Sequence, residues 1–142
     1  DELAQVVALT VFIPLLIGTG GNVGSQVVTT IVRAMAVENI RLGDIWRVVL
    51  KEARVGLMIG AVMSLVMFGR AVMLRSGFDI AIIVAGGVFL IVCWAAIVGA
   101  VLPLLLRRIG VDPAVVSAPF ISTLVDGTGL IIYFMIARAV LS

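Results

Sequence analysis

A single carboxylate, Asp126, lies near the middle of an otherwise apolar or small stretch from Ala114 to Leu141, in which Arg138 is the only other charge. A charged side chain at the centre of a membrane span costs roughly 3 kcal/mol on insertion scales. An ionisable residue at such a depth is therefore a candidate functional group. One and two helical turns before it stand Ser122 and Ala118, which predict a small, polar helix face that leads to the carboxylate.

This face suits a hard, oxygen-preferring cation that keeps its hydration shell. The side chains of Ala118 and Ser122, with Thr123 beside them, leave room for water. Of the common ions, magnesium sheds its water most reluctantly. The alternative is a structural Asp126, held by Asn22, by threonine or by backbone donors of a neighbouring helix.

One such carboxylate per chain is too small a ligand set for a cation, which predicts an oligomer. Cation paths in membranes often lie on a symmetry axis, where one residue is repeated around the pore. A two-fold homodimer is the commonest closed symmetry and would place two Asp126 side chains across one axis. Because two like charges repel strongly unless a cation lies between them, such a site favours a divalent cation.

The composition indicates an integral membrane domain. Of the 142 residues, 63% are apolar and 13% are charged, whereas about a quarter of the residues of a soluble domain are charged. The basic residues collect at the ends of apolar stretches, so we interpret them as markers of membrane topology and expect no nucleic-acid partner. Histidine is absent, and Cys93 is the only cysteine. A Ser/His/Asp site is therefore excluded, and we predict that the chain is not an enzyme.

The predicted fold is an all-α integral membrane bundle of four transmembrane helices per chain, homodimeric, with a short interfacial helix. A helix needs about 20 apolar residues to cross the hydrocarbon of a bilayer. Stretches of that length cover residues of about 3–36, 53–74, 80–106 and 114–141. Asp112 followed by Pro113 is expected to begin the fourth helix, as a cap and a first helical residue.

The segment before the second span is expected to form a short interfacial helix that runs into this span. Asp44 is a candidate N-cap, and Arg47, Lys51 and Arg54 fall on one helical face. We expect this helix to anchor at membrane lipid headgroups rather than to take part in transport.

The distribution of basic residues also predicts the orientation in the membrane. They gather between the first and second spans and between the third and fourth spans, so both segments are expected to be cytoplasmic and both ends of the chain to lie outside. An outside start without a signal sequence is natural for a piece of a longer protein, and we expect the chain to be one. The expected location is the inner (plasma) membrane of the cell, with several crossings.

The first span has a polar, glycine-rich centre from Gly18 to Gln26. A dinucleotide fingerprint would need a glycine where Val23 stands, and a phosphate loop needs a Gly-Lys-Ser/Thr ending, so we expect no organic cofactor. Two interpretations remain. Gly20 and Gly24 form a GxxxG pair that lets another helix approach closely, or the glycines loosen the helix so that its carbonyls face a water-filled path. A polar stripe that lipid should not face includes Asn22, Gln26, Thr29 and Thr30.

Two segments of the chain resemble the MgtE family of magnesium channels. The first is the stretch from Pro14 to Gln26, which contains GTGGN, followed by Ile31-Val32-Arg33-Ala34. The second is the pattern D-P-A-x-x-S-x-P-x-x-x-T-x-x-D from Asp112 to Asp126. The order and spacing of these motifs are specific, and the resemblance extends over the whole chain.

The resemblance implies a homodimer in which residues 1–142 are a transmembrane pore domain, equivalent to spans two to five of the family. The first and fourth spans of this chain would line a pore on the dimer axis, and Asp126 of both subunits would hold a hydrated magnesium ion through its waters. The implied pore-lining residues are Ala118, Ser122, Asn22, Gln26, Gly20 and Gly21. Some members of the family have Asn at the position of Ala118, so a polar contact to the hydrated ion is expected to be missing here. The family's cytosolic N-terminal domain, CBS domains and first span are expected to lie outside this chain, and gating with them.

The predicted function is therefore a magnesium channel or transporter that conducts hydrated divalent cations down their electrochemical gradient. Two other classes stay open. A secondary transporter that exchanges Mg²⁺ for Na⁺ or H⁺ would need a second ionisable residue inside the membrane, and we find none beyond Asp126. A purely structural membrane subunit would tolerate the substitution Asp126→Asn without loss of flux.

Overall fold

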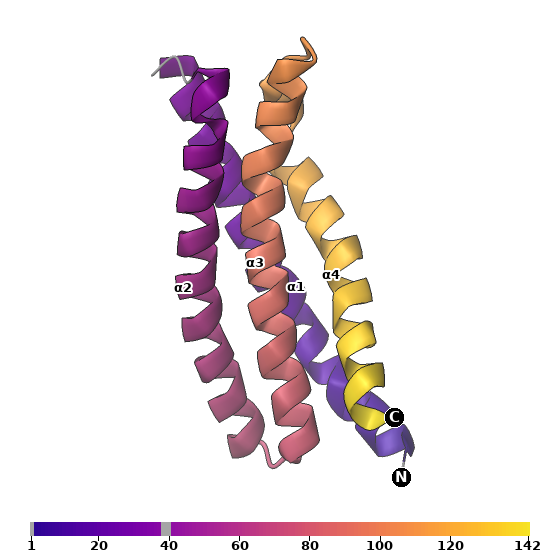
Figure 1. Cartoon of the computed structure of the whole chain (residues 1–142). Coiled ribbons are helices and arrows are strands. Elements are labelled where there is room, and N and C mark those ends of the chain that lie inside the picture. The colour runs from indigo at the N-terminus through magenta and orange to yellow at the C-terminus, as the bar shows by residue number, and fades with distance from the viewer. Residues whose placement is uncertain (1, 38–40) are drawn as a thin grey trace.

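The computed structural model describes residues 2–37 and 41–142. Within them the chain forms four long helices, α1 Glu2–Val37, α2 Ile45–Met73, α3 Phe78–Arg108 and α4 Ala118–Leu141, and two short 3-10 turns, η1 Leu42–Asp44 and η2 Pro113–Val115. The helices run up and down, so that the start of α1 and the end of α4 lie at the same end of the bundle (Figure 1). Each of the four is long and apolar enough to cross a membrane. The predicted all-helical bundle of four spans is confirmed.

The first three spans agree with their predicted ranges, with one difference in α2. α1 and α3 cover the stretches 3–36 and 80–106 with one or two more residues at each end. α2 already begins at Ile45, because no proline interrupts it before the second span and extending a helix is easier than starting a new one. The expected helix that runs into the second span is therefore the first part of α2, and its position at the membrane interface stays a prediction. Asp44 stands at the cap position, but its side chain accepts no hydrogen bond from α2.

The start of the fourth helix corrects the sequence prediction, which placed it at residue 114. Asp112 and Pro113 begin η2 instead, and Asp112 Oδ1 accepts a hydrogen bond of 2.9 Å from the amide of Ala114. α4 begins only after Ser117, which is its N-cap. Pro119 explains the difference: it has no N–H to donate to the carbonyl four residues earlier, so a continuous helix would lose a hydrogen bond there.

α3 is the central helix of the bundle. It packs against α1, α2 and α4, and in Figure 1 it lies between α2 and α4 with α1 behind it. It is the most apolar of the four spans, as expected for a helix that is covered on most sides. Its fully buried side chains include Ile83, Val84, Val88, Ile91, Val92 and Ala95. α1 and α4 also pack against each other.

α2 meets α3 through a stripe of small residues, as the four-residue repeat of Gly56, Gly60 and Ser64 predicts. A Cβ atom added to Gly56 would lie 2.7 Å from the Cβ of Ala96. One turn further, Gly60 packs against α3 in the same way. The Ser64 hydroxyl then donates a hydrogen bond of 3.0 Å to the carbonyl of Ala85. These small residues therefore let α2 and α3 approach each other closely.

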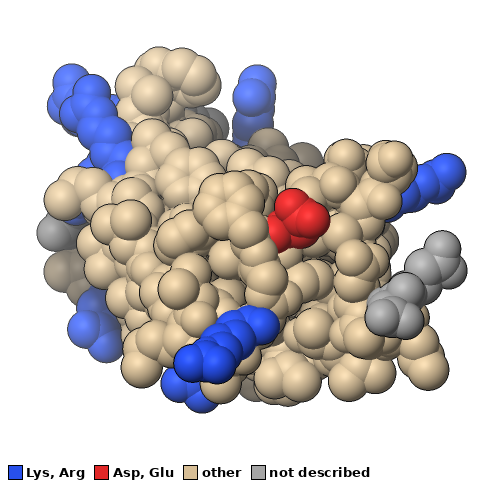
Figure 2. All heavy atoms as spheres, turned by 90° about the horizontal axis from the view of Figure 1, so that it is seen from below, with Lys and Arg blue, Asp and Glu red and all other residues tan. Residues whose placement is uncertain are grey.

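Charged side chains lie toward the two ends of the bundle. Seen from the end with the termini, basic side chains are spread around the outline of the bundle and do not form one continuous face (Figure 2). The opposite end carries more basic residues, namely Arg33, Arg41, Arg47, Lys51, Arg54, Arg107 and Arg108. The two basic segments of the sequence therefore share one end of the bundle, as the predicted topology requires.

Candidate functional site

Asp126 lies on the side of α4 that contacts α1. The contact is made at Gly21, where an added Cβ atom would lie 2.6 Å from Ser122 Oγ and 3.1 Å from Asp126 Oδ1. Gly21 is buried, whereas Ser122 and Asp126 are partly exposed. The serine and the carboxylate thus share one face of α4, as their four-residue spacing predicts, and this face rests on the glycine-rich centre of α1.

The carboxylate of Asp126 is not held by hydrogen bonds from the described residues. Its Oδ1 atom is buried, and no donor among the described residues forms a hydrogen bond with it. The alternative of a structural Asp126, held by Asn22, threonine or backbone donors, finds no support in this arrangement. A buried carboxylate oxygen without a donor is costly, and such exceptions are typical of sites that meet an ion, water or another chain.

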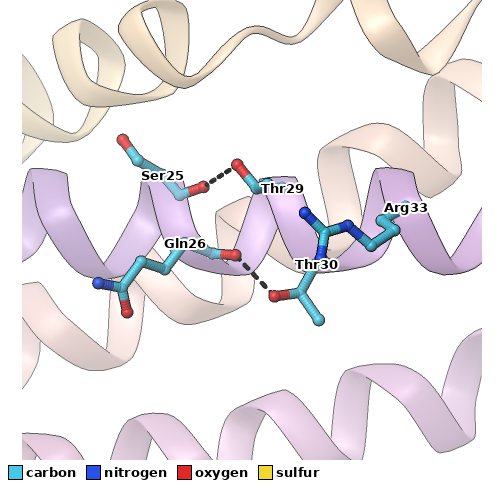
Figure 3. A pocket seen from close by; sticks show the side chains of 5 residues that line it. All are labelled: Ser25, Gln26, Thr29, Thr30 and Arg33. Atoms are coloured by element: carbon cyan, nitrogen blue, oxygen red, sulfur yellow. Dashed lines mark hydrogen bonds between the residues drawn. The ribbon is translucent and has the colours of Figure 1, made fainter.

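The polar stripe of α1 lies on the surface of the bundle. Asn22 and Gln26 are both exposed. Farther along α1 the stripe forms an open groove of about 410 Å³, which is lined by Ser25, Gln26, Thr29, Thr30 and Arg33 (Figure 3). The hydroxyls of Thr29 and Thr30 donate to the carbonyls of Ser25 and Gln26, at 2.8 and 2.9 Å. The Arg33 side chain is directed back along the helix toward Thr30 (Figure 3).

The polar surface of α1 borders a second groove, which reaches the start of α4. This groove has Thr29 and Arg33 on the α1 side and Ser117 on the α4 side, and its other lining residues are apolar. Ser25 connects the two helices, because its hydroxyl donates a hydrogen bond of 3.1 Å to the carbonyl of Ala118. Ala118, Ser122 and Asp126 therefore follow one edge of the polar surface.

The glycine-rich centre of α1 serves helix packing. An added Cβ atom at Gly20 would overlap the side chain of Ile91, and one at Gly24 would lie 2.9 Å from Ile121. α1 is an unbroken helix through this stretch, which does not support the interpretation of a loosened helix. Gly20 therefore faces the interior of the bundle, and of the two glycines in the candidate set it is Gly21 that contacts Asp126.

Three hydrogen bonds that sequence reasoning missed fix α4 against its neighbours. They join Ser25 to the Ala118 carbonyl, Trp94 Nε1 to Thr128 Oγ1 at 2.8 Å, and the Tyr133 hydroxyl to the Leu9 carbonyl at 2.9 Å. Along α4, Asp126 lies between the first bond and the other two. Hydrogen bonds on both sides of it therefore fix its position along the axis of α1. The only signal in the sequence was that tyrosine and tryptophan need a partner for their polar atom when buried. The partner itself cannot be derived from the sequence.

A single chain offers few direct ligands for a metal ion. No group of three or more His, Cys, Asp and Glu side chains that could hold a metal comes together in residues 2–37 and 41–142. Glu52, which is 7% exposed, is a further buried acidic side chain. It belongs to α2, and α3 separates α2 from α4 (Figure 1). At this face, one chain can therefore bind a cation through the Asp126 carboxylate, through hydroxyl and amide groups, and through water.

Comparison with known proteins places the chain in a family. The family model MgtE, described as a divalent cation transporter, matches residues 13–136. The chain belongs to the MgtE family. The resemblance of the GTGGN stretch and of the segment from Asp112 to Asp126 is thereby confirmed.

Three curated relatives of this MgtE-family chain carry the name magnesium transporter MgtE. The protein from Thermus thermophilus is 47% identical over 140 residues, which are 98% of this chain and 31% of the relative. The protein from Bacillus subtilis is 35% identical over 139 residues, with shares of 98% and 31%. The protein from Enterococcus faecalis is 33% identical over 135 residues, with shares of 95% and 30%. The chain thus spans about a third of the length of these relatives, and their names are those of transporters rather than enzymes.

Proposed function

We propose that residues 1–142 form the transmembrane pore domain of a magnesium channel or transporter, through which hydrated Mg²⁺ passes down its electrochemical gradient. The observation that carries the proposal is the Asp126 carboxylate beside the polar surface of α1: its Oδ1 is buried without a donor, and the residue as a whole is partly exposed, so that no described residue holds the carboxylate and a cation can reach it. The names of the relatives support magnesium as the substrate. In this proposal Asp126 is the residue that contacts the ion.

The exposed polar surface of α1 and α4 supports a homodimer. The residues of the α1 groove would meet hydrocarbon if the chain crossed the membrane alone, and polar side chains at such depth normally face protein or a water-filled cavity. A two-fold partner would bring the same surface opposite and enclose a polar path. Asp126 of both subunits would then face the axis, where a divalent cation relieves the repulsion between the carboxylates.

The available groups favour an ion that keeps its water. Mg²⁺ dehydrates reluctantly and is commonly held by one or two carboxylates together with several waters. In the proposed dimer, two Asp126 carboxylates meet this need, and Ser122, Asn22 and Gln26 would contact the waters. The Ala118 side chain has no polar atom, so at this position only the backbone carbonyl, which accepts a hydrogen bond from Ser25 and has a second lone pair, could contact the waters. Gly20, directed at Ile91, would support the pore wall from behind.

We place the proposed channel in the inner (plasma) membrane, with the more basic end of the bundle in the cytoplasm. The exposed apolar side chains of α2 would face lipid. A cation-coupled exchanger is less well supported, because Glu52, the other buried acidic residue in the described part of the chain, lies on α2 away from the polar surface. A structural subunit is less well supported, because it gives no reason to retain an unsatisfied carboxylate.

Magnesium flux into proteoliposomes tests the proposal. The variants Asp126→Ala and Asp126→Asn are expected to reduce flux at least about tenfold, since a contact between charged partners contributes about 1.5–3 kcal/mol. Asp79→Asn is the matched control, because Asp79 is an exposed carboxylate at the start of α3. Equal flux for wild type and Asp126→Asn would refute the proposal. A strict dependence of flux on a proton or sodium gradient would instead indicate the exchanger.

A further inference from the structure

The glycines of α1 differ in what their missing side chains would touch. At Gly20 and Gly24 an added Cβ atom would meet hydrocarbon side chains first, and at Gly18 it would meet nothing within 4 Å. At Gly21 the first atoms met are polar, Ser122 Oγ at 2.6 Å and Asp126 Oδ1 at 3.1 Å. Gly21 is therefore the glycine of this helix that touches the candidate ion-contacting carboxylate.

Because of this contact, the two oxygens of the Asp126 carboxylate have different surroundings. Oδ1 is buried against α1 without a hydrogen bond, while Asp126 as a whole is partly exposed. A side chain at position 21 would have to displace Ser122 Oγ and shift Oδ1, because both distances are shorter than ordinary contacts of a Cβ atom. The orientation of the carboxylate thus depends on the absence of a Cβ atom at Gly21.

We infer that Gly21 is a positioning residue that turns the Asp126 carboxylate so that Oδ1 rests on α1 and Oδ2 faces the hydrated cation. This inference rests on the proposed function and goes beyond it, since it names the residue that sets how the carboxylate meets the ion. A carboxylate that offers one oxygen accepts hydrogen bonds from fewer waters of the hydration shell than a carboxylate that offers both. Packing against the Gly21 backbone then decides which carboxylate oxygen faces the cation. No hydrogen bond from a side chain is needed for this.

The test compares Gly21→Ala with Gly18→Ala, the same change on the same helix where no atom is displaced. Gly21→Ala is expected to raise the half-saturating Mg²⁺ concentration for flux about two- to tenfold, the range that corresponds to forcing a side chain away from its preferred rotamer. Gly18→Ala is expected to leave it unchanged. Thermal unfolding of both variants, measured in detergent, separates an effect on the fold from an effect on ion binding.

A double variant sharpens the test. In Gly21→Ala with Ser122→Ala the shortest contact is removed, because the Ser122 Cβ atom would lie at an ordinary 3.7 Å, while the contact of 3.1 Å with Asp126 Oδ1 remains. We expect the double variant to recover thermal stability and to keep a raised half-saturating Mg²⁺ concentration relative to Ser122→Ala alone. If Gly21→Ala matches Gly18→Ala in flux, or if the double variant matches Ser122→Ala, the inference is wrong. The proposed function fails separately, through unchanged flux in Asp126→Asn.

Discussion

At the scale of single residues, the polar side chains of α4 differ in how they are satisfied. The hydroxyls of Thr123 and Thr128 donate to carbonyls one turn earlier, at 3.0 and 2.7 Å, and the Tyr133 hydroxyl donates to α1. Asp126 Oδ1 is the exception among the buried side-chain nitrogen and oxygen atoms of the described residues. Because local rules are otherwise obeyed, a costly exception of this kind points to function.

The hydrogen bond of Tyr133 is predicted to stabilise the fold without affecting ion binding. Tyr133→Phe removes the bond to the Leu9 carbonyl and keeps the ring, which packs against Gly87 and is 1% exposed. We expect a loss of about 1 kcal/mol in the free energy of unfolding, the usual contribution of one hydrogen bond. Chemical unfolding in detergent measures this loss, and the half-saturating Mg²⁺ concentration is expected to stay unchanged. An unaltered stability would show that the bond contributes nothing.

At the scale of the helices, the four spans are held together by close packing against one another and not by the hydrophobic effect. Lipid is as apolar as a leucine side chain, so helices in a membrane associate through dense packing and hydrogen bonds between them. Glycines provide this approach on two sides of α3. Gly56 and Gly60 bring α2 close to it, and Gly99 lies so close to α1 that an added Cβ atom would come within 2.9 Å of the Gly24 carbonyl oxygen.

Two glycines of α2 are predicted to respond in opposite ways to the same substitution. Gly56→Ala places a Cβ atom 2.7 Å from that of Ala96, and overpacking of this kind costs about 1–3 kcal/mol. Gly69→Ala meets nothing within 4 Å, so the better helix propensity of alanine, about 1 kcal/mol, is expected to raise or preserve stability. Thermal unfolding of the two variants measures the contrast. Equal shifts would contradict the assignment of Gly56 to a packing contact.

At the scale of the whole molecule, the surface of the bundle is divided between two environments. The outer side of α2 exposes large apolar side chains, such as Met58, Leu65 and Met73, which suit lipid. The surface of α1 and the start of α4 exposes polar side chains and two grooves. This division is compatible with the proposed homodimer, in which the polar side would meet a second copy of itself.

Cysteine crosslinking within the membrane tests this arrangement. In a background with Cys93→Ala, the variant Gln26→Cys is expected to form disulfide-linked dimers, because Gln26 is exposed on the polar surface that would face the two-fold axis. Leu65→Cys is the control, since Leu65 is 75% exposed on the apolar side of α2. Crosslinked species are measured by non-reducing gel electrophoresis after mild oxidation. Efficient crosslinking at position 65 and none at position 26 would contradict the proposed interface.

The sequence by itself determined the helical spans and the helix face on which the carboxylate lies. Apolar runs of sufficient length leave a chain in lipid with no alternative to helices, because every backbone amide must be satisfied within its own segment. Likewise, the four-residue spacing of Ala118, Ser122 and Asp126 places them on one face of any helix. These are local properties, and the predicted spans match the helices except at two starts. α2 begins earlier than its span, at Ile45, and α4 begins later, where the proline at position 119 outweighed the Asp112–Pro113 signal.

Only the tertiary structure decided which residues meet across helices. The sequence offered Gly20 and Gly21 as equivalent candidates, yet one faces Ile91 and the other faces Asp126. Nor could the sequence reveal that Trp94 and Tyr133 fix α4, or that Oδ1 of Asp126 is buried without a donor. The rotation and level of one helix against another depend on packing between residues far apart in the chain. A helix periodicity defines a face, and the neighbouring helix decides what that face contacts.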